Sequence, residues 1–129
     1  MTTWYLDTSA ALKLLVEEAE SPALARELDT LEPDLVSCWL LDTELRRASQ
    51  RTPDVTQSAV SQLLDGVSLY EVPASLFREA GLLPGPALRS VDAIHLAAAI
   101  RIGVDAVVTY DTRLTEAARA LGMQVVAPS

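Results

Sequence analysis

Thr3-Trp4-Tyr5-Leu6-Asp7-Thr8-Ser9 opens the chain with a short apolar run that ends in a carboxylate. The run predicts a β-strand at residues 3–6, and the spacing of apolar residues from Ser9 onward predicts a helix. The segment Ala106-Val107-Val108-Thr109 repeats this arrangement, because an acid, Asp111, again stands where the next helix begins. An apolar strand followed by a helix is the repeating unit of parallel α/β sheets.

The same alternation runs through the rest of the chain. Further strands are expected at 35–38, 69–72 and 124–126, and further helices after Ser21-Pro22 and at 40–50, 55–64, 73–81, 90–102 and 111–121. The helix after Ser21-Pro22 should turn Ala25 and Leu28 inward, and Ser90 should cap the later helix. The sequence therefore predicts one α/β domain over residues 1–129, with a doubly wound parallel sheet of 4–5 strands flanked by helices.

Composition limits the class of protein. No apolar run approaches the roughly 20 residues of a membrane span, and no signal peptide is apparent, so we expect no membrane association. The single cysteine, Cys38, is expected in a buried strand and fits a reducing cytoplasm. A net charge of −8 argues against a general nucleic-acid coat, but it does not exclude a nuclease that binds phosphate through a metal and a local arginine rim.

Four acids are predicted to meet at one edge of the sheet. Asp7 and Asp111 each follow a strand, and ligands bind beyond the carboxyl ends of strands in folds of this kind. Glu44 and Asp92 lie in the first turns of helices that should begin at the same edge. Two carboxylates about 5 Å apart repel by roughly 3 kcal/mol at an effective dielectric near 20. A fold would rarely gather four without a cation, so the cluster predicts a divalent metal site.

Each acid also has a simpler interpretation. Asp7 and Asp111 would cap the helices that follow them, although Thr8 and Ser9 are alternative caps that would leave Asp7 free. Asp92 would be an acid favoured by the helix dipole, and Glu44 would pair with Arg47. These interpretations explain the acids one at a time but not their convergence. Asp42 should point elsewhere on its helix, and Asp105 should lie at the opposite edge.

Other polar residues near the predicted cluster are candidates for supporting roles. His95, one turn after Asp92, lies among apolar residues and is expected to be packed and hydrogen-bonded rather than catalytic. Thr8 or Ser9 would donate to a phosphate or carboxylate oxygen. The basic residues include nine arginines, which favour bidentate contacts with phosphate. Those close to the acids are Arg46, Arg47, Arg89 and Arg113, and we expect Arg46, Arg89 and Arg113 to bind substrate if they are not simply surface charges.

These motifs together resemble a known family. Tyr-Leu-Asp-Thr-Ser-Ala-Ala-Leu-Lys-Leu, Thr-Glu-Leu-Arg-Arg-Ala, Arg-Ser-Val-Asp-Ala-Ile-His-Leu-Ala-Ala-Ala and Val-Val-Thr-Tyr-Asp-Thr-Arg-Leu are similar, in order and spacing, to the PIN-domain ribonucleases, above all to toxins of the VapBC type. The resemblance covers essentially the whole chain. It is most specific at the first and third motifs and looser at Glu44, and the position of Asp111 is the one that varies most in the family.

The resemblance implies a metal-dependent endoribonuclease with Mg²⁺, or Mn²⁺, as its cofactor. It implies RNA as the substrate, a homodimer, and inhibition by a small cognate VapB-type antitoxin. Asp7, Asp92 and Asp111 are assigned to the metal, and Glu44 is assigned to the metal or to the attacking water. Leu12, Leu15 and Leu24 would receive apolar residues of the antitoxin if they are exposed rather than part of the core.

Two other functions remain open from the sequence. Phosphoryl transfer to aspartate fits poorly, because Ser9 stands where a phosphatase of that type has its second Asp and the only lysine is Lys13. A catalytically silent binding module would keep the fold without the chemistry, and the presence of all four acids disfavours it. The chain has one cysteine and one histidine, so it lacks the Cys/His ligand set that would favour zinc.

Overall fold

The computed structural model describes residues 2–129. Its elements in chain order are β1 (Thr3–Leu6), α1 (Thr8–Lys13), α2 (Ser21–Leu31), β2 (Asp34–Cys38), α3 (Leu40–Arg51), α4 (Gln57–Leu64), β3 (Ser68–Tyr70), α5 (Ala74–Leu82), α6 (Ser90–Ile102), β4 (Ala106–Val108), α7 (Thr112–Ala120) and β5 (Gln124–Val126). Every strand and helix expected from the sequence is present, with ends that coincide with the expected ones or differ by one or two residues.

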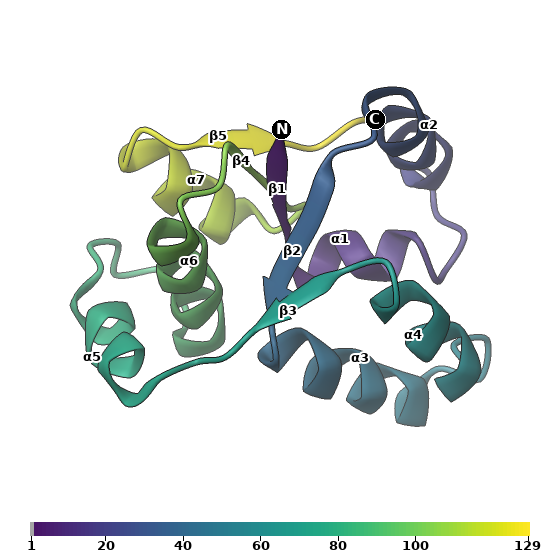
Figure 1. The fold of residues 1–129 in the computed structure, drawn as a ribbon, viewed down its shortest axis with the longest axis horizontal. Coiled ribbons are helices and arrows are strands. Elements are labelled where there is room, and N and C mark those ends of the chain that lie inside the picture. Colours follow the sequence, from purple (N-terminus) through teal and green to yellow (C-terminus); the bar gives the residue numbers. More distant parts are fainter. Residues whose placement is uncertain (1) are drawn as a thin grey trace.

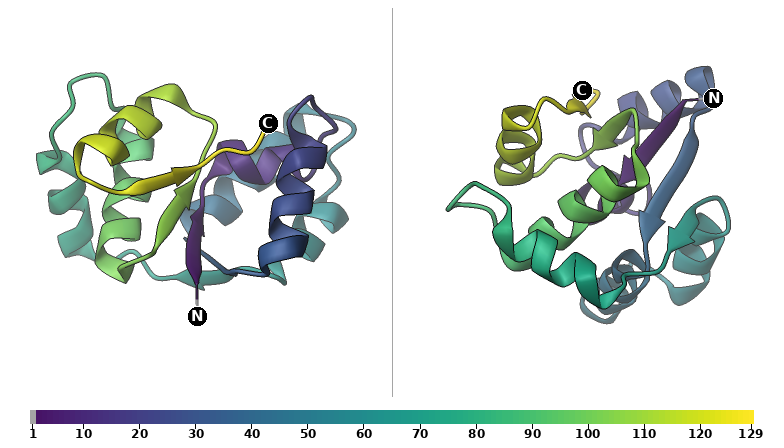
Figure 2. Two further views of the ribbon diagram at one scale, coloured as in Figure 1. Left: turned by 90° about the horizontal axis from the view of Figure 1, so that it is seen from above. Right: turned by 60° about the vertical axis from the view of Figure 1, so that its left-hand side comes forward.

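The five strands form one parallel sheet in the order β3-β2-β1-β4-β5 (Figure 1). Helices α1 to α4 cover one face and α5 to α7 cover the other, as the two further views also show (Figure 2). The predicted doubly wound α/β fold is confirmed. Strand order reverses between β1 and β4, so the carboxyl ends of these two strands form the switch point at which such sheets bind ligands.

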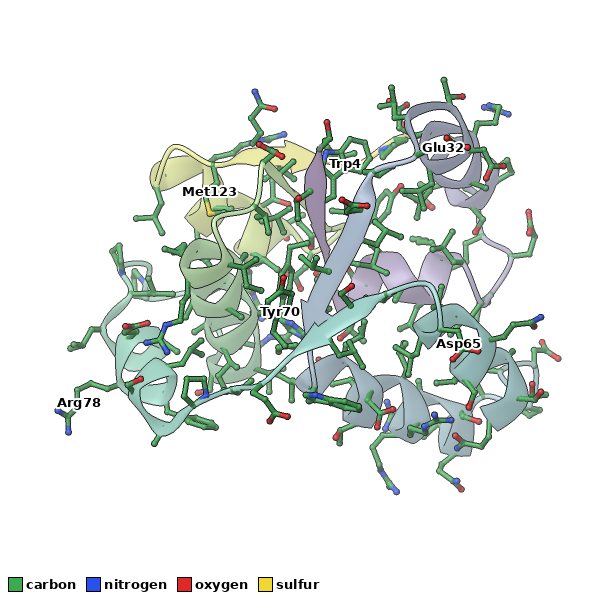
Figure 3. All side chains as sticks on the ribbon, in the orientation of Figure 1. Trp4, Glu32, Asp65, Tyr70, Arg78 and Met123 are labelled. Carbon is green, nitrogen blue, oxygen red and sulfur yellow. The ribbon has the colours of Figure 1, made fainter. Side chains whose placement is uncertain are left out.

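Alternation along β1 explains how the sheet builds a core on both faces. Trp4 and Leu6 are buried with α1 to α4, whereas Tyr5 is buried with α5 and α6. Side chains fill the space on both sides of the sheet, while Arg78 on α5 points away from it (Figure 3). Cys38 is fully buried at the end of β2, as predicted.

One expectation about α2 is wrong, and of the two alternatives for Leu12, Leu15 and Leu24 the structure favours the core. Ala25 is exposed, and the inward face of α2 carries Leu24 and Leu28 instead. Leu24 is fully buried, and Leu12 and Leu15 pack partly buried against the same core. These three leucines therefore hold the fold together and do not form an open apolar surface.

One helix start also differs from the prediction. Ser90 is the first residue of α6 and makes no side-chain cap, because Arg89 occupies the cap position. None of the helices within residues 2–129 combines the length and the apolar character that a membrane span requires.

Candidate active site

Asp7 is the most deeply buried acid of the candidate site. It follows β1 directly, its side chain is 2% exposed, and it caps α1 by accepting a hydrogen bond from the Ala10 N–H at 2.9 Å. The hydroxyl of Ser9 donates to its two oxygens at 2.8 and 3.0 Å, and that of Thr109 donates to Oδ2 at 2.5 Å. The capping interpretation is thus confirmed, and the suggestion that Thr8 or Ser9 would cap instead is wrong.

Thr109 links the end of β4 to the end of β1. Its hydroxyl donates to Asp7 and accepts a hydrogen bond from the Asp111 N–H at 3.1 Å. Asp111 in turn caps α7, because its Oδ1 accepts from the Leu114 N–H at 2.9 Å. The two acids that follow adjacent strands are therefore connected through one buried threonine.

Arg89 bridges Asp92 and Asp111. Its Nε lies 3.3 Å from Asp92 Oδ2, and its Nη2 lies 3.4 Å from Asp111 Oδ2. Asp92 stands in the first turn of α6, as expected from the sequence. The side chain of Arg89 is 64% exposed, whereas those of the two acids are mostly covered. The guanidinium therefore reaches in from solvent and neutralises two neighbouring carboxylates.

Glu44 reaches the same region from α3 and is held by one oxygen. Its Oε1 accepts a hydrogen bond from the Thr8 hydroxyl at 2.5 Å and contacts His95 Nε2 at 2.6 Å. The simpler interpretation, an ion pair with Arg47, is wrong. Thr8 and Ser9 both donate to carboxylates, which is one of the two roles expected for them.

His95 is packed and hydrogen-bonded, as predicted, but its partners make it part of the site. The side chain is 1% exposed, and Nδ1 lies 2.7 Å from the hydroxyl of Tyr5. The two rings meet edge to face, with centroids 5.6 Å apart. The Tyr5 hydroxyl also contacts Cys38 Sγ at 3.3 Å. A continuous line of polar contacts thus runs from β2 through β1 and α6 to Glu44.

The surroundings shift the pKa values of these acids in opposite directions. Burial raises the pKa of Asp7, although its hydrogen bonds oppose the shift. Burial and the nearby charge of Asp111 raise the pKa of Asp92, while Arg89 opposes the shift. Burial would raise the pKa of Glu44 too, but the hydrogen bond and charge of His95 outweigh it and lower the pKa.

The pKa of His95 moves in the direction that matches its partners. Burial lowers the pKa of an imidazole, but contacts with Cys38 and Glu44 outweigh this effect and raise the pKa of His95 to about 10. The buried imidazole of His95 and the partly exposed carboxylate of Glu44 consequently form an ion pair at neutral pH.

Three charged residues that stand near the acids in the sequence take different positions in the fold. Arg46 pairs with Asp42 at 3.4 Å and bonds Gln57 on α4, so its side chain is not among the acids. Arg113 is exposed on the first turn of α7. Asp105 accepts from the Thr3 N–H at the amino edge of the sheet, which confirms that it is remote from the candidate site.

The donor set is suited to a hard cation. Within residues 2–129, no three Asp, Glu, His or Cys side chains converge closely enough to hold an ion as they stand. Mg²⁺, however, keeps several waters and binds through one or two protein carboxylates together with substrate phosphate. Asp92 and Asp111, bridged by an exposed cationic side chain, meet that requirement with oxygen ligands alone. The residues present therefore fit Mg²⁺ or Mn²⁺.

Sequence reasoning missed the residues that hold the acids in place. Thr109 directly follows the apolar strand β4, and a polar side chain at that position indicates a hydrogen-bonding role at the edge of the sheet. Tyr5 lies on β1, two residues before Asp7, and is buried on the face of the sheet that α6 covers. Its contact with His95 depends on how α6 is rotated against the sheet, which local sequence does not encode.

An open parallel sheet with acids gathered at its switch point is the architecture of the PIN domain, and the family model described as "PIN domain" matches residues 4–120. Ribonuclease VapC35 of Mycobacterium tuberculosis is 44% identical over 129 residues that cover 96% of each chain. Ribonuclease VapC46 of the same species is 44% identical over 131 residues that cover 100% of each chain. The chain belongs to the PIN-domain family, in its group of VapC ribonucleases.

Solved structures support the fold assignment. VapBC2 from Rickettsia felis, bound to a DNA fragment from its promoter, aligns with a TM-score of 0.78 at 14% identity and covers 99% of this chain and 100% of that chain. VapC20 from Mycobacterium tuberculosis, described as a sarcin–ricin loop cleaving toxin, aligns with a TM-score of 0.71 at 20% identity over 88% and 94% of the two chains. At these identities the likeness concerns the fold alone.

Proposed function

We propose that this chain is the toxin of a VapBC-type toxin–antitoxin pair and that it hydrolyses RNA at the acidic site, with Mg²⁺ or Mn²⁺ as its cofactor. The observation that carries the proposal is the linkage of the four acids. Thr109 joins Asp7 to Asp111, Arg89 joins Asp111 to Asp92, and Glu44 approaches through Thr8, the neighbour of Asp7. Membership of the VapC ribonuclease group gives this arrangement its chemistry.

Asp92 and Asp111 would hold the metal, with Asp7 contributing directly or through a water. A divalent ion, when bound, lowers the pKa of water and stabilises charge on phosphate oxygens. Asp7 would orient a ligand water while its hydrogen bonds keep it fixed, because three donors already occupy much of its carboxylate. Glu44 would orient the attacking water and accept its proton.

Arg89 would bind the RNA substrate once its guanidinium has moved away from Asp92 and Asp111. Its high exposure permits the side chain to swing away, and a guanidinium suits a phosphate oxygen. Arg113, exposed on the first turn of α7, is a second candidate on the same side. A net charge of −8 makes such local cations necessary, since the protein as a whole repels RNA.

We propose a VapB-type antitoxin and a second copy of this chain as the protein partners. A basic side chain of the antitoxin would neutralise Asp92 and Asp111 in the way that Arg89 does here. Inhibition would then ease as the Mg²⁺ concentration rises, because the cation and the antitoxin would compete for the same oxygens.

The test is RNA cleavage by the purified protein. Total bacterial RNA is incubated with and without Mg²⁺ and with EDTA, and the new RNA ends are mapped. Cleavage is expected only with the metal and should be lost in Asp7→Asn, whereas Asp42→Asn should cleave normally because Asp42 pairs with Arg46 away from the site. Metal-independent cleavage, or full activity in Asp7→Asn, would contradict the mechanism. Absence of cleavage in the wild type would favour a silent binding module.

A further inference from the structure

His95 occupies an unusual place for a charged side chain. It is 1% exposed on the buried face of α6, where Ala93 and Ala97 to Ala99 form most of the packing surface. Both ring nitrogens have partners, Tyr5 on β1 and Glu44 on α3. Packing alone would be served equally well by an apolar residue, since a buried ion pair seldom stabilises a fold more than hydrophobic residues of similar volume.

The hydrogen bonds leave the two oxygens of Glu44 in different situations. Thr8 and His95 both approach Oε1, at 2.5 and 2.6 Å. Among residues 2–129, no group donates a hydrogen bond to Oε2, and the Glu44 side chain is 26% exposed, so solvent can reach it. An ionised carboxylate accepts only, so Nε2 of His95 carries the hydrogen of the contact with Oε1. One oxygen is therefore anchored, and the other is available to a water or phosphate.

We propose that His95 is a positioning residue, which fixes Glu44 through Oε1 so that Oε2 orients the attacking water. This inference rests on the proposed function of Glu44. Tyr5 supports the imidazole from the opposite side through Nδ1, and the edge-to-face contact with its ring restricts rotation. The hydrogen bond from the Thr8 hydroxyl to Oε1 restrains the Glu44 carboxylate further.

The arrangement joins the water-orienting acid to the metal-binding acids. Tyr5 lies two residues before Asp7 on β1, and His95 lies three residues after Asp92 on α6. Because His95 is bonded to β1 and α3 at once, a displacement of Glu44 would require movement of an element that also carries another acid. Displacing a catalytic group by about 1 Å can lower the rate roughly 100-fold, so holding Glu44 in place has a measurable effect on the rate.

The test compares His95→Leu, which loses both hydrogen bonds, with His95→Gln, which keeps an N–H near the position of Nε2. The substrate is a synthetic RNA that spans a mapped cleavage site. In His95→Leu, kcat should fall roughly 10- to 100-fold while KM and the Mn²⁺-induced rise in melting temperature stay as in the wild type. His95→Gln should recover most of kcat. Leu96→Ala, at a buried neighbour on the same helix, should lose stability and keep kcat.

Two outcomes would overturn the proposal. One is a folded His95→Leu with the kcat of the wild type. The other is a joint loss of kcat and of the Mn²⁺ effect, which would mean that His95 supports the whole site. Should His95→Leu fail to fold, Tyr5→Phe decides: a lower kcat at unchanged metal binding supports the proposal, and an unchanged kcat refutes it. Glu44→Gln separates the two hypotheses, because full activity in that variant contradicts the proposed function itself.

Discussion

Replacing Arg89 with glutamine should make the metal-free protein less stable and the metal-bound form easier to reach. Arg89 contacts Asp92 at 3.3 Å and Asp111 at 3.4 Å, the two acids assigned to the cation. In the metal-free protein its guanidinium offsets their mutual repulsion. The same contacts must break before the acids bind Mg²⁺ or Mn²⁺, so Arg89 competes with the metal.

The magnitude follows from the exposure of the side chain. Arg89 is 64% exposed, so each ion pair contributes roughly 0.2–1 kcal/mol after solvent screening. Loss of both should lower the free energy of unfolding by about 1 kcal/mol, a fall in melting temperature of roughly 3–5 °C for a domain of this size. Removing a competitor of that strength should tighten Mn²⁺ binding about fivefold.

Thermal unfolding without metal and calorimetric titration with Mn²⁺, both at one fixed ionic strength, measure the two effects. Arg113→Gln is the matched control, because it removes the same charge two residues after Asp111 while Arg113 makes no ion pair within residues 2–129. Weaker or unchanged Mn²⁺ binding in Arg89→Gln would refute the competition. Equal tightening in both variants would show that only the net charge matters.

Three further outcomes are expected. Asp7→Asn should lose at least about 100-fold in RNA cleavage but none of its metal-free melting temperature, because burial raises the pKa of Asp7 and asparagine still caps α1. The free energy of unfolding, measured with urea, should fall from pH 7 to pH 10 in the wild type and less in His95→Gln. The pKa of His95 is about 10 in the folded protein and about 6.5 in the unfolded chain, so protonation of His95 stabilises the fold fully below about pH 6.5, and this contribution is lost as the pH rises through 10. Ser37→Ala should be neutral or stabilising in thermal melts, since its buried hydroxyl has no hydrogen-bond partner within residues 2–129.

The fold and the edge that carries the acids could be predicted because both depend on local pattern. Apolar runs such as Ala106–Val108 specify buried parallel strands, and the rule for ligand sites in such sheets places Asp7 and Asp111 together. Helix direction adds Asp92 and Glu44. Each of these steps requires only the order of strands and helices along the chain.

The contacts inside the site were less predictable because they depend on helix rotation. In the simpler interpretation Glu44 pairs with Arg47 on its own helix, yet α3 turns Glu44 toward Thr8 and His95 and turns Arg46 toward α4. Glu44 and Arg46 are two residues apart, so a rotation of α3 by about 200° would bring Arg46 to the side that Glu44 occupies. The prediction of which α2 residues are buried was wrong for the same reason, since Leu24 rather than Ala25 faces the core.

Helix capping and metal binding are compatible roles, because a carboxylate has two oxygens. Asp111 gives Oδ1 to the N-terminus of α7 and directs Oδ2 to Arg89. Glu44 is anchored at Oε1 and keeps Oε2 available, whereas Asp7 caps α1 through Oδ1 and also accepts hydrogen bonds at Oδ2. The anchored oxygen fixes the direction of the carboxylate, so the second oxygen is aimed before any ligand arrives. Asp92, whose carboxylate has Arg89 as its one hydrogen-bond and ion-pair partner within residues 2–129, lacks such an anchor and depends most on the cation for its position.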